Sequence, residues 1–504
     1  MSLRTKIISV ALIAALLAGL IWAAGPGHAL DTAQEQTSSL FSRSKETLYL
    51  WYSDDALTDY LNEIAVAYNS ENRDYRIEPE YKDGTDFLQA VNTASVQAES
   101  DMPDLYIIAD NSLGRAYRAG LAAEVSNSSV FENTLFYPQT AINSVTYQGR
   151  RVAYPFYFET AALLYNADYL QSFADKAGKS LEETAPSTIQ DIIDFAGNYD
   201  APEGVTSVFS WDVGDIFYNY YFIGESSDLG GECGDDRDKI DIYNADTISA
   251  LQVFQQLNQY FSLDTDENSY SDILDDFAQG KSVFTVATTD ALKTLSEKIS
   301  SSAGGDETES AASDTEGEAS SDASSESSSE TSAESSDAGD SGQQDAAGTL
   351  QNYGAVPLPD ITDTLGTRGI AVTNCLVING YSEKQEGAED FAAFLNEDQS
   401  SDFFDRTGYL LCRNGVTYSD SHADGFVSAY QSSECESKIS GTGNFWILLE
   451  NTMENVWNGA DPNESLKSLD EQLMIQLTGD ESYTVEAIDS PEPIMLSNGQ
   501  DDGN

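Results

Sequence analysis

Carboxylates and aromatic side chains occur together at three places in the sequence. The first is Glu159, which lies in the apolar run 154–164, and the third is Trp446, which follows Asn444 and Phe445. The second combines two aromatic and two acidic residues within seven positions: Trp211, Asp212, Asp215 and Phe217. Aromatic rings stack on flat C–H faces, and carboxylates and amides hydrogen-bond to hydroxyl groups. These three places therefore have the residue types of a site for a polyhydroxylated solute.

Each place also has a structural interpretation. Glu159 could form a structural ion pair, although a carboxylate in so apolar a run favours contact with a ligand. Core packing competes for the aromatic residues that follow Phe217, especially Tyr221 and Phe222. The chain has only 5 tryptophans, and we take Trp211 and Trp446 as the best candidates for stacking on such a solute.

The charge of the chain limits its partners. It has 24 basic and 86 acidic residues, which gives a net charge of −62. Nucleic acid and anionic lipid need a positive field, so both are excluded as partners, and a neutral or cationic solute fits best. With only His28 and His422, a histidine metal centre or a Ser-His-Asp triad has almost nothing to build on. We therefore expect no catalytic residue, no metal and no cofactor.

The N-terminus predicts export. Arg4 and Lys6 precede an apolar run from Ile7 to Ala24, and small residues follow it. This is the pattern of a signal peptide over residues 1–30, but the run is also long enough for an uncleaved membrane anchor with 31–46 as its tether. We expect the protein at the extracellular face of the membrane. There the four cysteines could form disulfides or remain unpaired thiols: Cys233, Cys375, Cys412 and Cys435.

Short apolar strands alternate with helical patterns after the tether. Strands are expected near 48–52, 75–81 and 105–108, and helices near 57–68 and 87–94, which predicts a parallel, doubly wound sheet. Ligands bind at the carboxyl ends of such strands, so Asp54 and Asn111 become candidate ligand-binding residues. Residues 300–347 are almost all small or acidic and predict a disordered insert. We expect a second flexible segment over 481–504.

Motifs in a fixed order resemble bacterial extracellular sugar-binding proteins of the maltose/maltodextrin-binding type. They run from about Leu48 to about Leu477 and comprise Met102-Pro103-Asp104-Leu105, Tyr147-Gln148-Gly149-Arg150-Arg151-Val152-Ala153-Tyr154-Pro155, Tyr165-Asn166, Gly280-Lys281, Asn352-Tyr353-Gly354 and Thr407-Gly408. The resemblance implies two doubly wound α/β lobes joined by three crossovers, with hinges near 157–160, 352–355 and 405–410. The first lobe is then 47–157 with 353–405, and the second is 158–299 with 406–480.

The resemblance also implies the function and the roles of the candidate residues. Such proteins close around a carbohydrate and deliver it to the permease of an ABC importer, as monomers and without chemistry on the solute. Glu159 stands where the relatives have a ligand-binding glutamate, Asp215 and Phe217 match an acid and an aromatic that contact the sugar, and Trp446 matches a stacking tryptophan. Asp290 stands where a tryptophan is expected, and the cluster near Asn111 is also altered. These departures predict a different glycan from maltodextrin.

Three other functions are compatible with the same residues. The acids Glu159, Asp212 and Asp215 could form a glycosidase pair, although nothing in the sequence fixes their separation. A cell-surface glycan receptor would share the fold without coupling to an importer. A binding protein for a cationic solute such as a polyamine would fit the negative charge.

Overall fold

The computed structural model describes residues 45–84, 86–126, 136–265, 269–303, 349–397 and 402–497. The predicted signal or anchor segment, almost all of the tether and nearly all of the predicted insert lie outside these ranges. In the described ranges, no helix is both long and apolar enough to cross a membrane. The four cysteines lie within them, and all four are free thiols.

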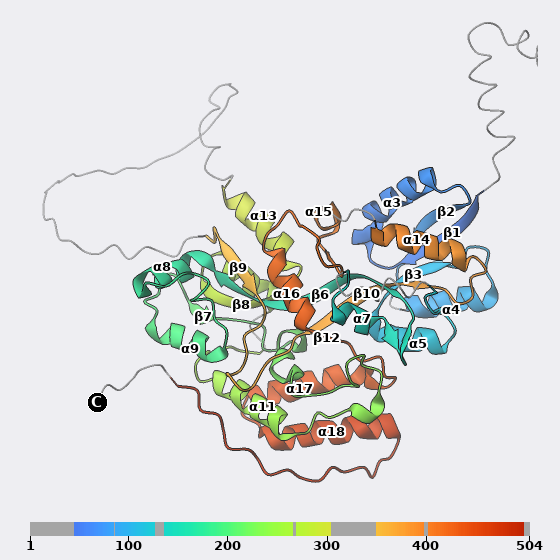
Figure 1. The fold of residues 1–504 in the computed structure, drawn as a ribbon. Helices are drawn as coiled ribbons and strands as arrows, with labels where there is room; N and C mark the ends of the chain where they lie inside the picture. The colour runs from blue at the N-terminus through green and yellow to red at the C-terminus, as the bar shows by residue number, and fades with distance from the viewer. Residues whose placement is uncertain are drawn as a thin grey trace, which may run out of the picture.

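A central sheet of ten strands runs through the described part of the chain (Figure 1). Its main path has the order β2-β1-β3-β10-β6-β8-β7, and β9, β11 and β12 pair at its sides. The strands are β1 (Glu46–Tyr52), β2 (Tyr75–Tyr81), β3 (Leu105–Ala109), β6 (Tyr154–Asn166), β7 (Ser207–Phe209), β8 (Ser282–Thr288), β9 (Tyr353–Val356), β10 (Ile370–Ile378), β11 (Leu410–Leu411) and β12 (Glu434–Cys435).

Helices cover this sheet on both faces. In the first half of the chain they are α3 (Thr58–Glu71), α4 (Phe87–Gln97), α5 (Leu113–Arg118), α7 (Gln139–Ser144), α8 (Ala167–Ala177), α9 (Ile189–Asn198), α10 (Tyr221–Gly224) and α11 (Ala245–Leu257). In the second half they are α12 (Tyr270–Ala278), α13 (Ala291–Ala303), α14 (Gln385–Glu397), α15 (Phe403–Thr407), α16 (Ala423–Ser432), α17 (Phe445–Trp457) and α18 (Pro462–Thr478). Helices α11, α17 and α18 pack together at one side of the molecule (Figure 1).

The first lobe forms as its sequence predicts. Strand β1 pairs in parallel with both β2 and β3, and α3 and α4 are the connections between them. The buried side chains of α3 recur at helical spacing and include Leu61, Ile64 and Tyr68, so the helix buries one face against the sheet. The carboxyl ends of β1 and β3 therefore meet at one edge, as expected for a doubly wound sheet.

The strand β6 joins the two lobes. Its first half pairs with β10 and its second half with β8 and β9. Alternate residues of the second half belong to different hydrophobic clusters, Ala162 and Leu164 to one and Ala161 and Leu163 to the other. Because alternate side chains point to opposite faces, both faces of this part of the sheet are buried. This run therefore has a structural reason to be continuously apolar.

Two predicted boundaries differ from the structure. Strand β9 pairs with the second half of β6, so the second crossover lies between β9 and β10, after the predicted hinge at 352–355. The segment 481–497, expected as a flexible tail, lies along the second lobe instead. Backbone carbonyls of Pro491, Ile494 and Leu496 accept hydrogen bonds from side chains of α11 and the turn after it. We call this segment the C-terminal strap.

A short hairpin precedes β6 and explains one of the sequence motifs. Strands β4 (Thr146–Tyr147) and β5 (Arg150–Arg151) pair antiparallel. The two residues between them, Gln148 and Gly149, both have positive φ, at 50° and 75°. Two-residue hairpin loops of type I′ require positive φ at both positions, which glycine adopts without strain. The glycine of this motif is therefore a turn residue that sets the entry to β6.

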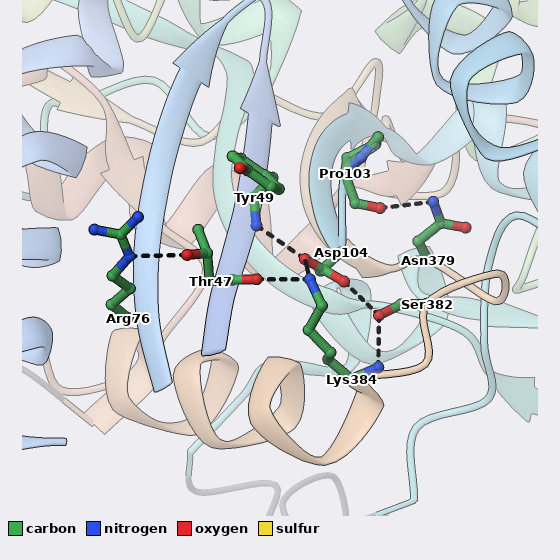
Figure 2. A network of polar contacts seen from close by, with 8 residues as sticks. All are labelled: Thr47, Tyr49, Arg76, Pro103, Asp104, Asn379, Ser382 and Lys384. Atoms are coloured by element: carbon green, nitrogen blue, oxygen red, sulfur yellow. Dashed lines mark hydrogen bonds and ion pairs between the residues drawn. The ribbon is translucent and has the colours of Figure 1, made fainter. Parts of the chain in front are cut away.

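The Asp104 of the Met-Pro-Asp-Leu motif also has a structural role (Figure 2). Its carboxylate is fully buried and accepts hydrogen bonds from the Tyr49 amide at 3.0 Å, the Ser382 hydroxyl at 2.6 Å and the Lys384 ammonium at 2.8 Å. Lys384 also donates to the Thr47 carbonyl at 2.6 Å. The carboxylate thus links the backbone of β1 to the loop after β10. Its buried charge is compensated by these hydrogen-bond and ion-pair partners.

Candidate functional site

Asp54 lies directly beyond the carboxyl end of β1. One oxygen, Oδ1, accepts the Ala56 amide at 3.1 Å and so caps the 3₁₀ helix Asp55–Leu57. The other oxygen, Oδ2, accepts the Tyr157 hydroxyl at 3.3 Å. Burial raises the pKa of Tyr409, and the nearby Asp54 carboxylate raises it further. Asp54 is therefore held by backbone and side-chain donors, with its position set by the end of the strand.

Glu159 lies on β6 opposite Val372 of β10. Burial raises the pKa of the Glu159 carboxyl, and the nearby charges of Asp54 and Asp290 raise it further. These two carboxylates come from opposite halves of the sheet, because Asp54 follows β1 and Asp290 follows β8. Glu159 thus stands between acidic groups of the two lobes.

A cavity of about 740 Å³ opens beside Asp54 and Glu159, and Asp290 is not among its lining residues. Its lining includes Asp54, Tyr157, Glu159 and Asn374, together with residues from the ends of β1 and β3 and from α4. Volumes between about 300 and 1,000 Å³ are usual for small-molecule sites. Of the nine predicted ligand-binding residues, Asp54 and Glu159 line this cavity.

Asp290, Asp212 and Asp215 lie on the second lobe with partners of their own. The Asp290 carboxylate accepts the Tyr270 hydroxyl at 3.0 Å, and it also binds the Thr288 hydroxyl. Asp212 accepts the amides of Gly214 and Tyr270, each at 3.0 Å, and burial raises its pKa. Asp215 caps the 3₁₀ helix Ile216–Tyr218 by accepting a hydrogen bond from the backbone amide of Phe217. The Phe217 residue itself is half-buried. Both Asp212 and Asp215 therefore hold the local backbone.

Trp211 and Trp446, the two stacking candidates, have different environments. Trp211 is 0 % exposed and stacks on Phe209 with ring centroids 4.4 Å apart, while its indole N–H donates to Asn219. This position does not fit a stacking platform, because both ring faces are covered by the core. Trp446 is only partly buried, and its ring meets the edge of Tyr220 at 5.4 Å. Trp446 thus keeps surface available for a ligand.

Two stacked tyrosine pairs lie beside the carboxylates, one near Asp54 and one near Asp290, and the sequence did not predict them as site residues. Tyr157 stacks on Tyr409 and Tyr218 stacks on Tyr270, each pair with centroids 4.7 Å apart. Tyr157 could have been found, because it precedes Glu159 by two residues on a strand and so points to the same face. Tyr409 and Tyr270 lie far away in the sequence, and no local pattern brings them to β6.

The predicted residue Asn111 contacts a second group of buried acids. Its side-chain amide donates to Glu436 at 2.7 Å. Burial raises the pKa of Glu436, and the adjacent Asp110 raises it further. Burial also raises the pKa of Glu434 to about 8, and this carboxyl accepts the Tyr220 hydroxyl. Among the described residues, no group of three or more His, Cys, Asp or Glu side chains is arranged to hold a metal ion.

The chain matches known proteins in both sequence and fold. Residues 63–425 match the family of bacterial extracellular solute-binding proteins. The fold is similar to the extracellular solute-binding protein of Staphylococcus aureus solved with maltose, with a TM-score of 0.65 and 15 % identity over 86 % of this chain and 98 % of the other.

A second similar structure is the maltose-binding periplasmic protein of Listeria monocytogenes with maltose, with a TM-score of 0.63 and 17 % identity over 88 % of this chain and 100 % of the other. A cyclo/maltodextrin-binding protein with maltotetraose has a TM-score of 0.64 and 15 % identity, covering 87 % of this chain and 99 % of the other. These structures have the two-lobed α/β fold that the sequence motifs predicted. The chain belongs to the bacterial extracellular solute-binding proteins.

Proposed function

We propose that this protein binds a carbohydrate in the cleft in front of β6 and delivers it to the permease of an ABC importer. The observation that carries the proposal is the grouping of Asp54, Tyr157 and Glu159 around one cavity at the carboxyl ends of β1 and β3. Carboxylates beside tyrosine rings suit the hydroxyls and C–H faces of a sugar. The structures with maltose and maltotetraose share the fold and support a carbohydrate as the solute.

Binding is proposed to close the two lobes about their crossovers. The first lobe contributes Asp54, and the second contributes Asp290 and the partly exposed Trp446. Strand β6 carries Glu159 between them, so a solute there would contact both lobes. Closure around a ligand is a hinge motion, and the ligand shifts the equilibrium by its greater affinity for the closed form. We further propose that the protein acts as an exported monomer at the cell surface.

Hydrolysis of the solute is not part of the proposal. The two second-lobe acids that the sequence suggested as partners of Glu159 accept backbone N–H groups: Asp212 from Gly214 and Tyr270, and Asp215 from Phe217. A general acid or nucleophile must face the scissile bond. The protein is proposed to return its solute unchanged, whether it serves transport or a cell-surface receptor. ATPase stimulation of a reconstituted permease by the loaded protein distinguishes these two roles.

A thermal-shift screen over mono- and oligosaccharides tests the proposal. A solute that binds only the native state raises the melting temperature by linkage, by an amount that grows with its concentration. We expect Glu159→Ala and Trp446→Ala each to abolish the shift that the best carbohydrate causes. If no carbohydrate shifts the melting temperature, or if both variants keep the full shift, the proposed ligand or its place is wrong.

A further inference from the structure

Three carboxylates lie along one face of β6. Tyr157, Glu159 and Ala161 alternate along the strand and so share a face. The Asp54 carboxylate lies at the Tyr157 end, 3.3 Å from the tyrosine hydroxyl. Ala161 pairs with Thr288 of β8, and the Thr288 hydroxyl binds the Asp290 carboxylate. Glu159 therefore has one carboxylate from each lobe at its two sides.

These carboxylates lack a positive partner. No ion pair within the described ranges includes Asp54, Glu159 or Asp290. The cation that lines the cavity is Arg115, whose guanidinium donates to Ser112 at 3.1 Å and is exposed. Asp86 lines the same cavity and opposes this charge. The site is therefore net negative.

Aromatic faces accompany the carboxylates at both ends. The stacked pair Tyr157 and Tyr409 lies against Asp54, and the stacked pair Tyr218 and Tyr270 lies against Asp290. The ring quadrupole attracts a cation to an aromatic face, and a carboxylate forms its strongest hydrogen bonds with charged donors. Each end of the Glu159 face thus has a carboxylate that favours a positively charged group, beside the partly exposed ring of Tyr409 or Tyr270.

Closure makes the charge of the solute decisive. Moving the lobes together around a neutral sugar removes water from Glu159 while its acidic neighbours remain, and an uncompensated buried charge is strongly unfavourable. A protonated amine on the solute would neutralise this charge and hydrogen-bond to it. We propose that the cleft selects a solute bearing a protonated amine, which is an amino sugar or aminated oligosaccharide if the proposed carbohydrate-binding function holds.

Calorimetric titration with matched sugars tests this inference. The panel has mono- and disaccharides in gluco, galacto and manno configuration, each with a free 2-amine, with the same amine N-acetylated, and with a 2-hydroxyl, and it adds spermidine. We expect at least one sugar of the panel with a free 2-amine to bind at least about 10-fold more tightly than the same sugar with the amine acetylated. Glu159→Gln, which keeps the shape and removes the charge, should reduce that ratio by about 10-fold. Glu203→Gln, an exposed acid away from the cleft, should leave it unchanged.

The other outcomes separate the two proposals. If an acetylated or hydroxylated sugar binds as tightly as the free amine, the amine inference is overturned and the carbohydrate function stands. If spermidine binds and no sugar does, the amine inference stands and the carbohydrate function fails. If no member of the panel binds, both are overturned.

Discussion

The hydroxyl of Tyr157 lies 3.3 Å from Oδ2 of Asp54, which links the middle of β6 to the end of β1. Burial strongly raises the pKa of Tyr157, and the charge of Asp54 raises it further. The phenol therefore stays protonated and serves as a fixed donor that orients the carboxylate. Because Glu159 is two residues further along the same strand face, Tyr157 links Asp54 to the face of β6 that carries Glu159.

Trp211 and Trp446 should respond differently to truncation. Trp211→Ala removes a fully buried side chain and should lower the free energy of unfolding by about 3–5 kcal/mol. Trp446→Ala removes a partly exposed ring and should cost less stability but weaken binding of the solute. Urea denaturation and titration of both variants check this. The assignment would be contradicted if the two variants lost the same stability and only Trp211→Ala, while still folded, bound the solute more weakly.

The buried carboxylate of Asp104 should be essential to the first lobe. Asp104→Ala leaves the Tyr49 amide, the Ser382 hydroxyl and the Lys384 ammonium without their common acceptor. We expect the free energy of unfolding to fall by about 1–3 kcal/mol. Arg76→Ala is the matched control, because this exposed side chain at the periphery of the same network donates to the Thr47 hydroxyl through its Nε and forms an exposed ion pair with Glu78. Urea denaturation should show a change below about 0.5 kcal/mol for the control, and an equal loss in both variants would contradict the role of Asp104.

The Glu434 carboxyl should make stability depend on pH. Burial raises its folded pKa to about 8, whereas a glutamate in the unfolded chain titrates near ~4.3. The unfolded state therefore loses this proton first, so the contribution of Glu434 is fully present below about pH 4 and is lost as the pH rises through 8. Glu434→Gln cannot ionise, so its melting temperature should fall less between pH 5 and pH 8 than that of the unaltered protein. Parallel curves for the two proteins, measured by circular dichroism, would contradict the buried-carboxyl assignment.

The C-terminal strap should stabilise the second lobe. Leu496 is 7 % exposed and packs in the hydrophobic cluster of that lobe. Deleting 481–504 removes this packing and leaves Gln256 and Tyr260 without their acceptors at Ile494 and Leu496. We expect a lower melting temperature and faster proteolysis near α11, measured against a chain shortened only at 498–504. Identical melting of the two truncated chains would mean that the strap adds no stability.

The sequence predicts the local parts of the fold well. Alternating apolar runs define β1, β2 and β3 and the helices between them, because each buries one face in a periodic pattern. The ordered packing of the end of the C-terminal strap was not predicted. Its backbone carbonyls accept hydrogen bonds from side chains such as Gln256 and Tyr260, which belong to a helix and turn far away in the sequence. Such partners follow from packing and leave no signal within the segment itself.

The sequence predicts those residues of the candidate site whose role is indicated by their immediate neighbours in the chain. Asp54 follows a strand end and Glu159 interrupts an apolar run, and both line the cavity. Trp211 has the same composition around it as a sugar site, but its ring is fully buried against Phe209 and Trp457. Tyr409 reaches Tyr157 only because it directly precedes β11, which pairs with β6. Composition alone therefore does not separate a buried tryptophan from an exposed one.

The most direct measurement of the central claim is calorimetric titration of the best carbohydrate from the thermal-shift screen into three proteins: unaltered, Glu159→Gln and Glu203→Gln. The account predicts one site per chain in the unaltered protein and in Glu203→Gln with equal affinity. It predicts affinity at least about 10-fold weaker in Glu159→Gln, because a charge-assisted hydrogen bond is lost. Equal affinity in all three proteins, or no carbohydrate that binds the unaltered one, would contradict the account.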